Sequence, residues 1–190
     1  MIDYFKLIHR HIPVETPSYQ LYVVHVCLVT ERALRIARKM GLDGRRCRFI
    51  EEAGMLHDIG ICRVYEPRLG CRGQLPYLAH GVVGRQILEA EGLPDHALVA
   101  ERHVGVGISA REVREARLPL PEQDMLPKTL EEQILTWSDL FYNKVPDVLW
   151  EERTLSQVEL RVQQYGEGPW RRFQHLKKRI LPYDLVAQVE

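Results

Sequence analysis

The chain has 190 residues, a length that suits one domain with a sizeable core. Apolar residues make up 45% and charged residues 27%, as in ordinary globular proteins, and 26 basic residues balance 26 acidic ones. This balance gives no global field for binding a nucleic acid polymer or a membrane, and no segment approaches the roughly 20 apolar residues of a membrane span. Without a signal peptide or a metal-binding cysteine pattern, we expect a cytoplasmic protein with free thiols.

Helical spacing of apolar residues dominates the first half of the chain. Residues 19–40 carry one apolar stripe and residues 44–57 carry a second. The pattern stops between Gly60 and Pro76, where five glycines or prolines and three arginines fall in seventeen residues. These residues predict a long loop, and loops of that length are often functional. Helical spacing returns over residues 77–91.

The second half of the chain also predicts helices, mostly from their start signals. A proline at position 94 opens a helix that ends at about His103. Capping-box patterns at Ser109–Glu112, Thr129–Glu132 and Thr154–Gln157 predict three further helix starts, and residues 169–181 resemble a final helix. Because no alternating strand exceeds a few residues, the predicted fold class is all-α.

Five of the predicted helices carry a histidine or an aspartate where the apolar pattern predicts burial. These residues are His25, His57, Asp58, His80, His103 and Asp139, with His57 and Asp58 in the phrase MLHDIG. A lone histidine on an apolar face is more often a hydrogen-bonded core residue, and a His-Asp doublet at a helix end also suits a structural histidine with a capping aspartate. A buried carboxylate, however, is costly unless it is paired or bound to a metal. Six such residues together therefore predict a metal site.

The remaining histidines lack this apolar context. We expect His9, His11, His96 and His175 at the surface.

The ligand order H…HD…H…H…D resembles that of the HD superfamily of metal-dependent phosphohydrolases, specifically its members with the HDIG signature. The resemblance covers about residues 18–145 and includes the phrases HGVVG and ERHVGVG and the stretch LPLPEQDMLPKTLEEQI before WSDL. It implies an all-α HD-domain helical bundle with a metal site at its centre. We expect a single HD domain over residues 1–190, with a core at about 18–145 and C-terminal helices at 150–181 packed on it.

The resemblance also implies roles for the six residues. The metal site common to the superfamily would consist of His25, His57, Asp58 and Asp139. His80 and His103 would be the additional histidines of members that bind two metal ions, with Asp58 as the bridging carboxylate. We expect two divalent ions among Fe, Mn, Zn, Co and Ni, since ligand softness does not choose between them. The expected catalytic residues are Asp58, His80 and His103.

The implied reaction is hydrolysis of a phosphate ester, either a nucleotide or another small molecule, by a metal-activated hydroxide. The expected partner is this small molecule, with neither a nucleic acid polymer nor a membrane. Two alternatives use the same residues: a di-iron HD-type oxygenase, and a non-catalytic HD domain that binds a nucleotide.

The sequence departs from the superfamily pattern at one position. Many members have a lysine in the phrase HDxxK, whereas this chain has Ile61 there. Candidates for the substrate-binding cation are Arg63, Arg68, Arg72, Arg102 and Lys144. For each of the five, the alternative interpretation is a solvated surface charge that does not contact the substrate.

Overall fold

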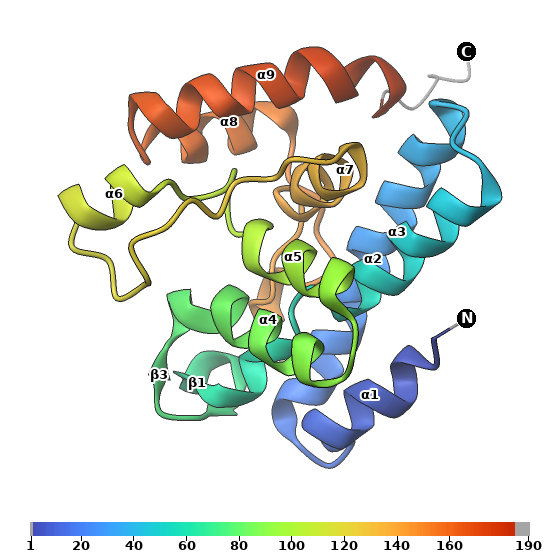
Figure 1. Ribbon diagram of the computed structural model, residues 1–190, viewed down its shortest axis with the longest axis vertical. Helices are drawn as coiled ribbons and strands as arrows, with labels where there is room; N and C mark the ends of the chain where they lie inside the picture. The colour runs from blue at the N-terminus through green and yellow to red at the C-terminus, as the bar shows by residue number, and fades with distance from the viewer. Residues whose placement is uncertain (1, 185–190) are drawn as a thin grey trace.

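The computed structural model describes residues 2–184, and α-helices dominate it (Figure 1). The α-helices in these residues are α1 (Tyr4–His11), α2 (Pro17–Lys39), α3 (Gly44–Leu56), α4 (His80–Ala90), α5 (Pro94–Arg102), α6 (Ala110–Glu115), α7 (Leu130–Asp139), α8 (Leu155–Gln163) and α9 (Glu167–Asp184). The all-α fold class is confirmed, and the first four predicted helices agree with α2 to α5 to within three residues. None of the helices in residues 2–184 has the length and apolar character needed to span a lipid bilayer.

The segment between α3 and α4 is more ordered than the predicted loop. It contains η1 (Ile59–Arg63), β1 (Val64–Glu66), η2 (Pro67–Leu69), β2 (Cys71–Arg72), β3 (Leu75–Pro76) and η3 (Tyr77–Ala79). The strand order is β2-β1-β3, with β1 antiparallel to β2 and parallel to β3. Strands of two or three residues are too short to produce a recognisable alternation, so the sequence pattern could not reveal them.

The apolar residues form two clusters that meet along α2. One cluster joins α2, α3, α7, α8 and α9 around Trp137 and Phe173, and the other joins α1, α2, η1, α4 and α5 around Tyr22 and Leu88. Figure 1 shows α7 near the middle of the molecule, with α8 and α9 across one end and α1 at the other. Within α2, His25 lies next to Val26 of the second cluster and one turn from Val29 of the first. The polar site therefore lies where the two clusters meet.

Helix α9 is joined to the rest of the molecule by buried polar contacts at its C-terminal end. The Asp184 carboxylate accepts hydrogen bonds from Arg32 of α2 and from the indole N–H of Trp137 in α7, the latter at 2.7 Å. The Arg32 guanidinium also lies 3.6 Å from the centre of the Phe141 ring. Because these groups are buried, the end of α9 depends on their mutual pairing.

Two of the three predicted capping boxes are confirmed, at Ser109 before α6 and at Thr154 before α8. The third is only half formed. Thr129 does accept a hydrogen bond from the Glu132 N–H, but the Glu132 carboxylate accepts from the Lys128 N–H at 2.7 Å instead of returning to Thr129. That carboxylate also pairs with Arg102 of α5, a contact that could not be predicted from sequence spacing.

Candidate metal centre

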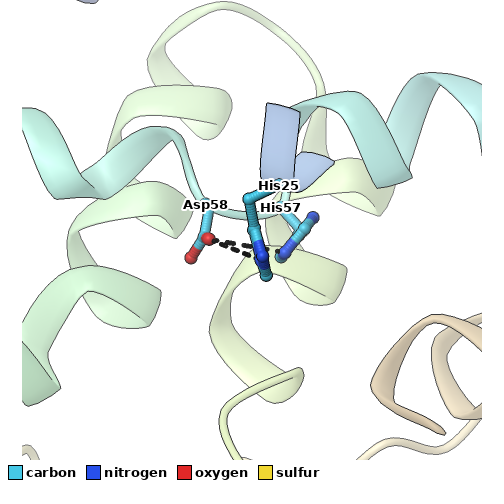
Figure 2. Close-up of side chains that lie close together, drawn as sticks. All are labelled: His25, His57 and Asp58. Atoms are coloured by element: carbon cyan, nitrogen blue, oxygen red, sulfur yellow. Dashed lines mark ion pairs between the residues drawn. The ribbon is translucent and has the colours of Figure 1, made fainter. Parts of the chain in front are cut away.

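The six predicted ligand residues come together in two groups that share Asp58. One carboxylate oxygen of Asp58, Oδ2, lies 3.3 Å from His25 Nε2 and 3.6 Å from His57 Nε2 (Figure 2). The other oxygen, Oδ1, lies 3.4 Å from His80 Nε2 and 3.4 Å from His103 Nε2. Asp58 is completely buried, and each of its oxygens faces a different pair of imidazoles.

Asp139, the last residue of α7, joins the first group. Its Oδ1 atom lies 2.9 Å from His25 Nε2 and 3.6 Å from His57 Nε2. This position gives the first group two imidazoles and two carboxylates, whereas the second group has two imidazoles and Asp58 alone.

Three of the four imidazoles are oriented by the ends of the helices that carry them. In each of the three, ring atom Nδ1 lies close to the carbonyl oxygen three residues earlier. The pairs are His57 with Gly54 (2.6 Å), His80 with Tyr77 (2.7 Å) and His103 with Ala100 (2.8 Å). His57 and His103 directly follow α3 and α5, whose last carbonyls have no partner within the helix, and each histidine donates to one of them. His80 begins α4 and donates to the Tyr77 carbonyl of η3, which also accepts the His80 backbone N–H. Because a carbonyl only accepts, Nδ1 carries the proton, and the Nε2 lone pair points to the centre.

Glycines bring these helix ends close together. A Cβ atom at Gly60, the glycine of MLHDIG, would lie 2.0 Å from the His80 carbonyl oxygen and 2.5 Å from the Gly84 nitrogen. A Cβ atom at Gly81 would lie 2.9 Å from the Ala100 carbonyl oxygen in α5. Residues with side chains would push η1, α4 and α5 apart, so the glycines of HDIG and HGVVG set the distances between the histidines.

The polar atoms at this centre fit a bound cation better than they fit one another. Oδ1 of Asp58, the Nε2 atoms of His25 and His57, and Oδ1 of Asp139 are buried without a hydrogen-bond partner of acceptable geometry, whereas Oδ2 of Asp58 has Lys144 Nζ at 2.7 Å. Nε2 of His80 and Nε2 of His103 lie 3.2 Å apart, and with Nδ1 of each ring donating to a carbonyl, two neutral rings would present lone pairs to each other. Such buried atoms are expensive unless a ligand satisfies them. Nitrogen and oxygen donors in this arrangement suit a divalent metal of borderline character.

Lys144 supplies a cation at the same place. Its Nζ atom lies 2.7 Å from Asp58 Oδ2, and only 13% of its side chain is exposed. Burial alone would raise the pKa of Asp58, but Lys144 and His57 outweigh burial and hold that pKa well below its usual range. Burial opposes the charge on Lys144, and Asp58, Tyr77 and Asp139 together raise its pKa above the ordinary value, so the ammonium stays charged.

Burial has a different effect on His80. It lowers the pKa of His80 to about 3, although Asp58 acts in the opposite direction. The imidazole is therefore neutral at physiological pH, which is the form that binds a metal.

The structure brings one of the five candidate cations, Lys144, to the centre, places Arg68 on the wall of the adjoining cavity and leaves three elsewhere. Lys144 and Arg68 line a cavity of about 750 Å³ that reaches His80 and Asp139. Arg63 and Arg72 are exposed on the segment between α3 and α4 and do not line this cavity, and Arg102 pairs with Glu132 at 3.1 Å. Ile61, at the position of the superfamily lysine, is buried in the second apolar cluster.

Arg153 is a residue of this region that sequence reasoning missed. Its guanidinium donates to the carbonyl oxygens of Leu140 at 3.0 Å and Tyr142 at 2.7 Å, and its backbone N–H donates to Phe141 at 2.8 Å. These contacts hold the turn that leads from Asp139 to Lys144. No motif or residue spacing in an irregular segment of this kind predicts such a contact.

One predicted surface histidine is in fact buried. His96 is 8% exposed, and its Nε2 atom lies 3.4 Å from Glu52 Oε2. Its ring also packs on Phe49, with the ring centres 4.8 Å apart. The prediction for His96 was wrong because α5 turns this side of its first turn toward α3 rather than toward solvent. His9 and His175 are exposed as predicted, and His11 is half-buried beside Glu91.

Comparisons with known proteins point to one family. The family model described as HD domain matches residues 22–144. An uncharacterized protein of Methanocaldococcus jannaschii is 38% identical over 120 residues, which is 62% of this chain and 63% of that protein.

Two further relatives are named tRNA (cytidine(56)-2'-O)-methyltransferase. The one from Thermoplasma volcanium is 34% identical over 116 residues, and the one from Picrophilus torridus is 31% identical over 120 residues. The matches cover 60% and 63% of this chain but 30% of each relative. The chain thus spans less than two thirds of the length of these curated relatives. No solved structure matches the chain significantly.

Proposed function

The chain belongs to the HD domain family, and from that premise we propose that it hydrolyses a phosphate ester of a small molecule, such as a nucleotide, at the His/Asp centre. HD domains bind divalent metals, and the two groups of buried ligands in this structure are places that could hold them. The observation that carries the proposal is the position of Asp58. Its two oxygens face two pairs of imidazoles, while a lysine beside it lines a cavity large enough for a substrate.

We assign the ligands as the two groups suggest. His25, His57, Asp58 and Asp139 would hold one ion, and Asp58, His80 and His103 would hold a second. Bound metal would lower the pKa of a coordinated water and draw negative charge away from the phosphoryl oxygens.

The remaining chemistry belongs to residues of the chain. In the proposed reaction a water oxygen forms a bond to phosphorus while the bond from phosphorus to the alcohol oxygen breaks. The alcohol leaves with a proton that the water supplies, and inorganic phosphate is the other product. The Lys144 ammonium, beside Asp58 and at the cavity wall, would contact the phosphoryl oxygens and offset the charge that develops on them. It would thus replace the lysine that the chain lacks at position 61.

The test is a phosphate-release screen on the full chain loaded separately with Mn, Fe, Co, Ni or Zn. We expect release of inorganic phosphate that depends on the metal and continues without dioxygen. Oxygen consumption without phosphate release would instead support the di-iron oxygenase. Nucleotide binding without turnover under any metal would support the non-catalytic alternative.

The Lys144→Gln variant tests the role of the lysine. It should lower kcat/KM for the best ester by about 10- to 100-fold, because a charge-assisted contact to phosphate is lost. The metal content should stay at the wild-type level. The matched control is Lys178→Gln at an exposed position on α9, which should leave both quantities unchanged. Equal activity of Lys144→Gln and wild type would contradict this role.

The names of two relatives describe methyl transfer to tRNA. Each match covers 30% of a longer protein, so these names leave open what the matched part does. We therefore propose hydrolysis, and not methyl transfer, for this chain.

A further inference from the structure

The cavity at the His/Asp centre is much larger than a phosphoryl group requires. Its volume is about 750 Å³, and it runs from His80, Asp139 and Lys144 at the inner end to Tyr165, just beyond α8. Cavities of this volume enclose most of a whole small-molecule ligand. Most of the space is therefore available to the alcohol side of the ester.

The part of the wall away from the centre is mainly apolar. The side chains that form it come from η3, from the segments before and after α6, and from the segments before η4 and after α8. They include Leu78, Val104, Ile108, Leu118, Val145 and Tyr165. These residues offer hydrophobic and aromatic surface to a bound ligand.

The charged groups on this wall are largely occupied by partners within the protein. The pairs are Glu112 with Arg172 (2.7 Å), Glu115 with Arg111 (2.7 Å), Arg161 with the Tyr165 hydroxyl (2.7 Å), and Arg153 with the Leu140 and Tyr142 carbonyls. Arg68 of η2 and Glu66 just before it also line the cavity; Arg68 is exposed, and the Glu66 carboxylate accepts from the Arg68 backbone N–H at 3.3 Å. A polar ligand with several hydroxyl groups would therefore find few free partners along the buried part of the wall.

We propose that the alcohol side of the substrate is bulky and largely apolar or aromatic, and that the outer cavity holds it. This inference rests on the proposed function. Apolar surface that moves from water to this wall favours binding. Hydroxyl groups facing the same wall would lose their hydrogen bonds to water without replacement. The cavity thus discriminates against polyol phosphates of equal size.

A comparison of hexyl phosphate with sorbitol 6-phosphate tests this inference on the metal-loaded full chain. Both are esters of a primary alcohol with six carbons, so the bond that breaks is chemically similar. We expect kcat/KM to be at least about 10-fold higher for hexyl phosphate, a ratio that one hydrophobic pocket can provide. An equal or higher value for sorbitol 6-phosphate would overturn the inference.

A double variant links this preference to the wall. Val145 and Tyr165 are 40% and 47% exposed, so replacing both with serine removes apolar surface at little cost to the fold. The Val145→Ser, Tyr165→Ser protein should lose most of the preference for hexyl phosphate. The matched control is Val14→Ser, Tyr65→Ser, at residues that are 51% and 61% exposed and do not line the cavity, and it should keep the preference. An unchanged preference in the cavity variant would contradict the assignment.

Binding of a non-hydrolysable phosphonate separates this inference from the proposed reaction. Tighter binding of hexylphosphonate than of methylphosphonate by titration calorimetry, with no cleavage of any ester, would support the apolar cavity and refute the hydrolysis. Cleavage of both six-carbon esters at equal rates would support hydrolysis and refute the apolar cavity.

Discussion

Two regions of the molecule hold the centre together, and they do so by different means. In the histidine region, formed by the end of α3, η1, α4 and α5, backbones touch through glycines, and ring nitrogens bond to helix-end carbonyls. In the lysine region, the turn after α7 that carries Lys144, the chain is held by the Arg153 side chain and its donated hydrogen bonds. In the histidine region the backbones are too close to accept an added side chain, whereas the lysine region depends on a few polar contacts. Substitutions should therefore act abruptly in the histidine region and gradually in the lysine region.

The largest effect should come from Gly60→Ala in the histidine region. The added methyl group would lie 2.0 Å from the His80 carbonyl oxygen, so η1 and α4 must separate. We expect a loss of about 3 kcal/mol or more in the free energy of unfolding, measured with urea, together with loss of bound metal. The matched control is Gly44→Ala at the start of α3, where the new Cβ meets nothing within 4 Å. Similar results for both variants would mean that backbone contact does not hold this region.

A smaller effect is expected from Arg153→Ala in the lysine region. The variant leaves the Leu140 and Tyr142 carbonyls without their donor and should cost about 2 kcal/mol in the free energy of unfolding. Metal content should remain near the wild-type level, while kcat/KM should fall because Lys144 is no longer held in place. The control is Arg171→Ala, which removes an exposed pair with Glu167 away from this cavity and should change none of these three quantities measurably. Complete loss of metal in Arg153→Ala would show that the two regions are not separate.

The smallest predicted effect is on the pH dependence of the free energy of unfolding, through the ion pair of Glu112 and Arg172 at the cavity wall. Burial would raise the pKa of Glu112, but hydrogen bonds from Arg172 and Ser109 outweigh it and hold that pKa below its usual range. A lowered pKa means that the stabilisation is present above the unfolded value of about 4.3 and is lost as pH falls through the folded value. Glu112→Gln should therefore flatten the dependence of the free energy of unfolding on pH between about 5 and 3, and Arg172→Gln should do the same. An unchanged slope in both would remove Glu112 as a source of acid sensitivity.

The same contrast explains what the sequence could predict. His25, His57, His80, His103 and Asp139 lie on or directly after helices whose apolar spacing is visible in the sequence, so their burial was predictable, and the resemblance to the ligand order of the HD superfamily implied that they converge. The ring orientations of His57, His80 and His103 also follow from local structure, since Nδ1 of each lies close to a carbonyl three residues earlier.

The lysine region could not be predicted in the same way. The contact between Lys144 and Asp58 joins residues far apart in sequence, and it depends on the path of an irregular turn that Arg153 holds from eleven residues beyond Tyr142. The unexpected partner of Glu132 has a similar origin, because Arg102 reaches it from another helix. Periodicity describes which face of a helix is buried, but it does not describe which long side chains meet across the structure.

We propose that Asp58 would supply a ligand to both metal positions, and the most direct test is the number of ions bound per chain. The proteins to compare are wild type, His25→Ala, His80→Ala and Asp58→Ala, each loaded with metal, dialysed and analysed by inductively coupled plasma mass spectrometry. Circular dichroism would establish that each variant retains its helices.

We predict two ions per chain in the wild type. His25→Ala and His80→Ala should each lose one, because each removes a ligand from a different group, and Asp58→Ala should lose both. A folded Asp58→Ala protein that keeps the full wild-type complement of metal would contradict the claim.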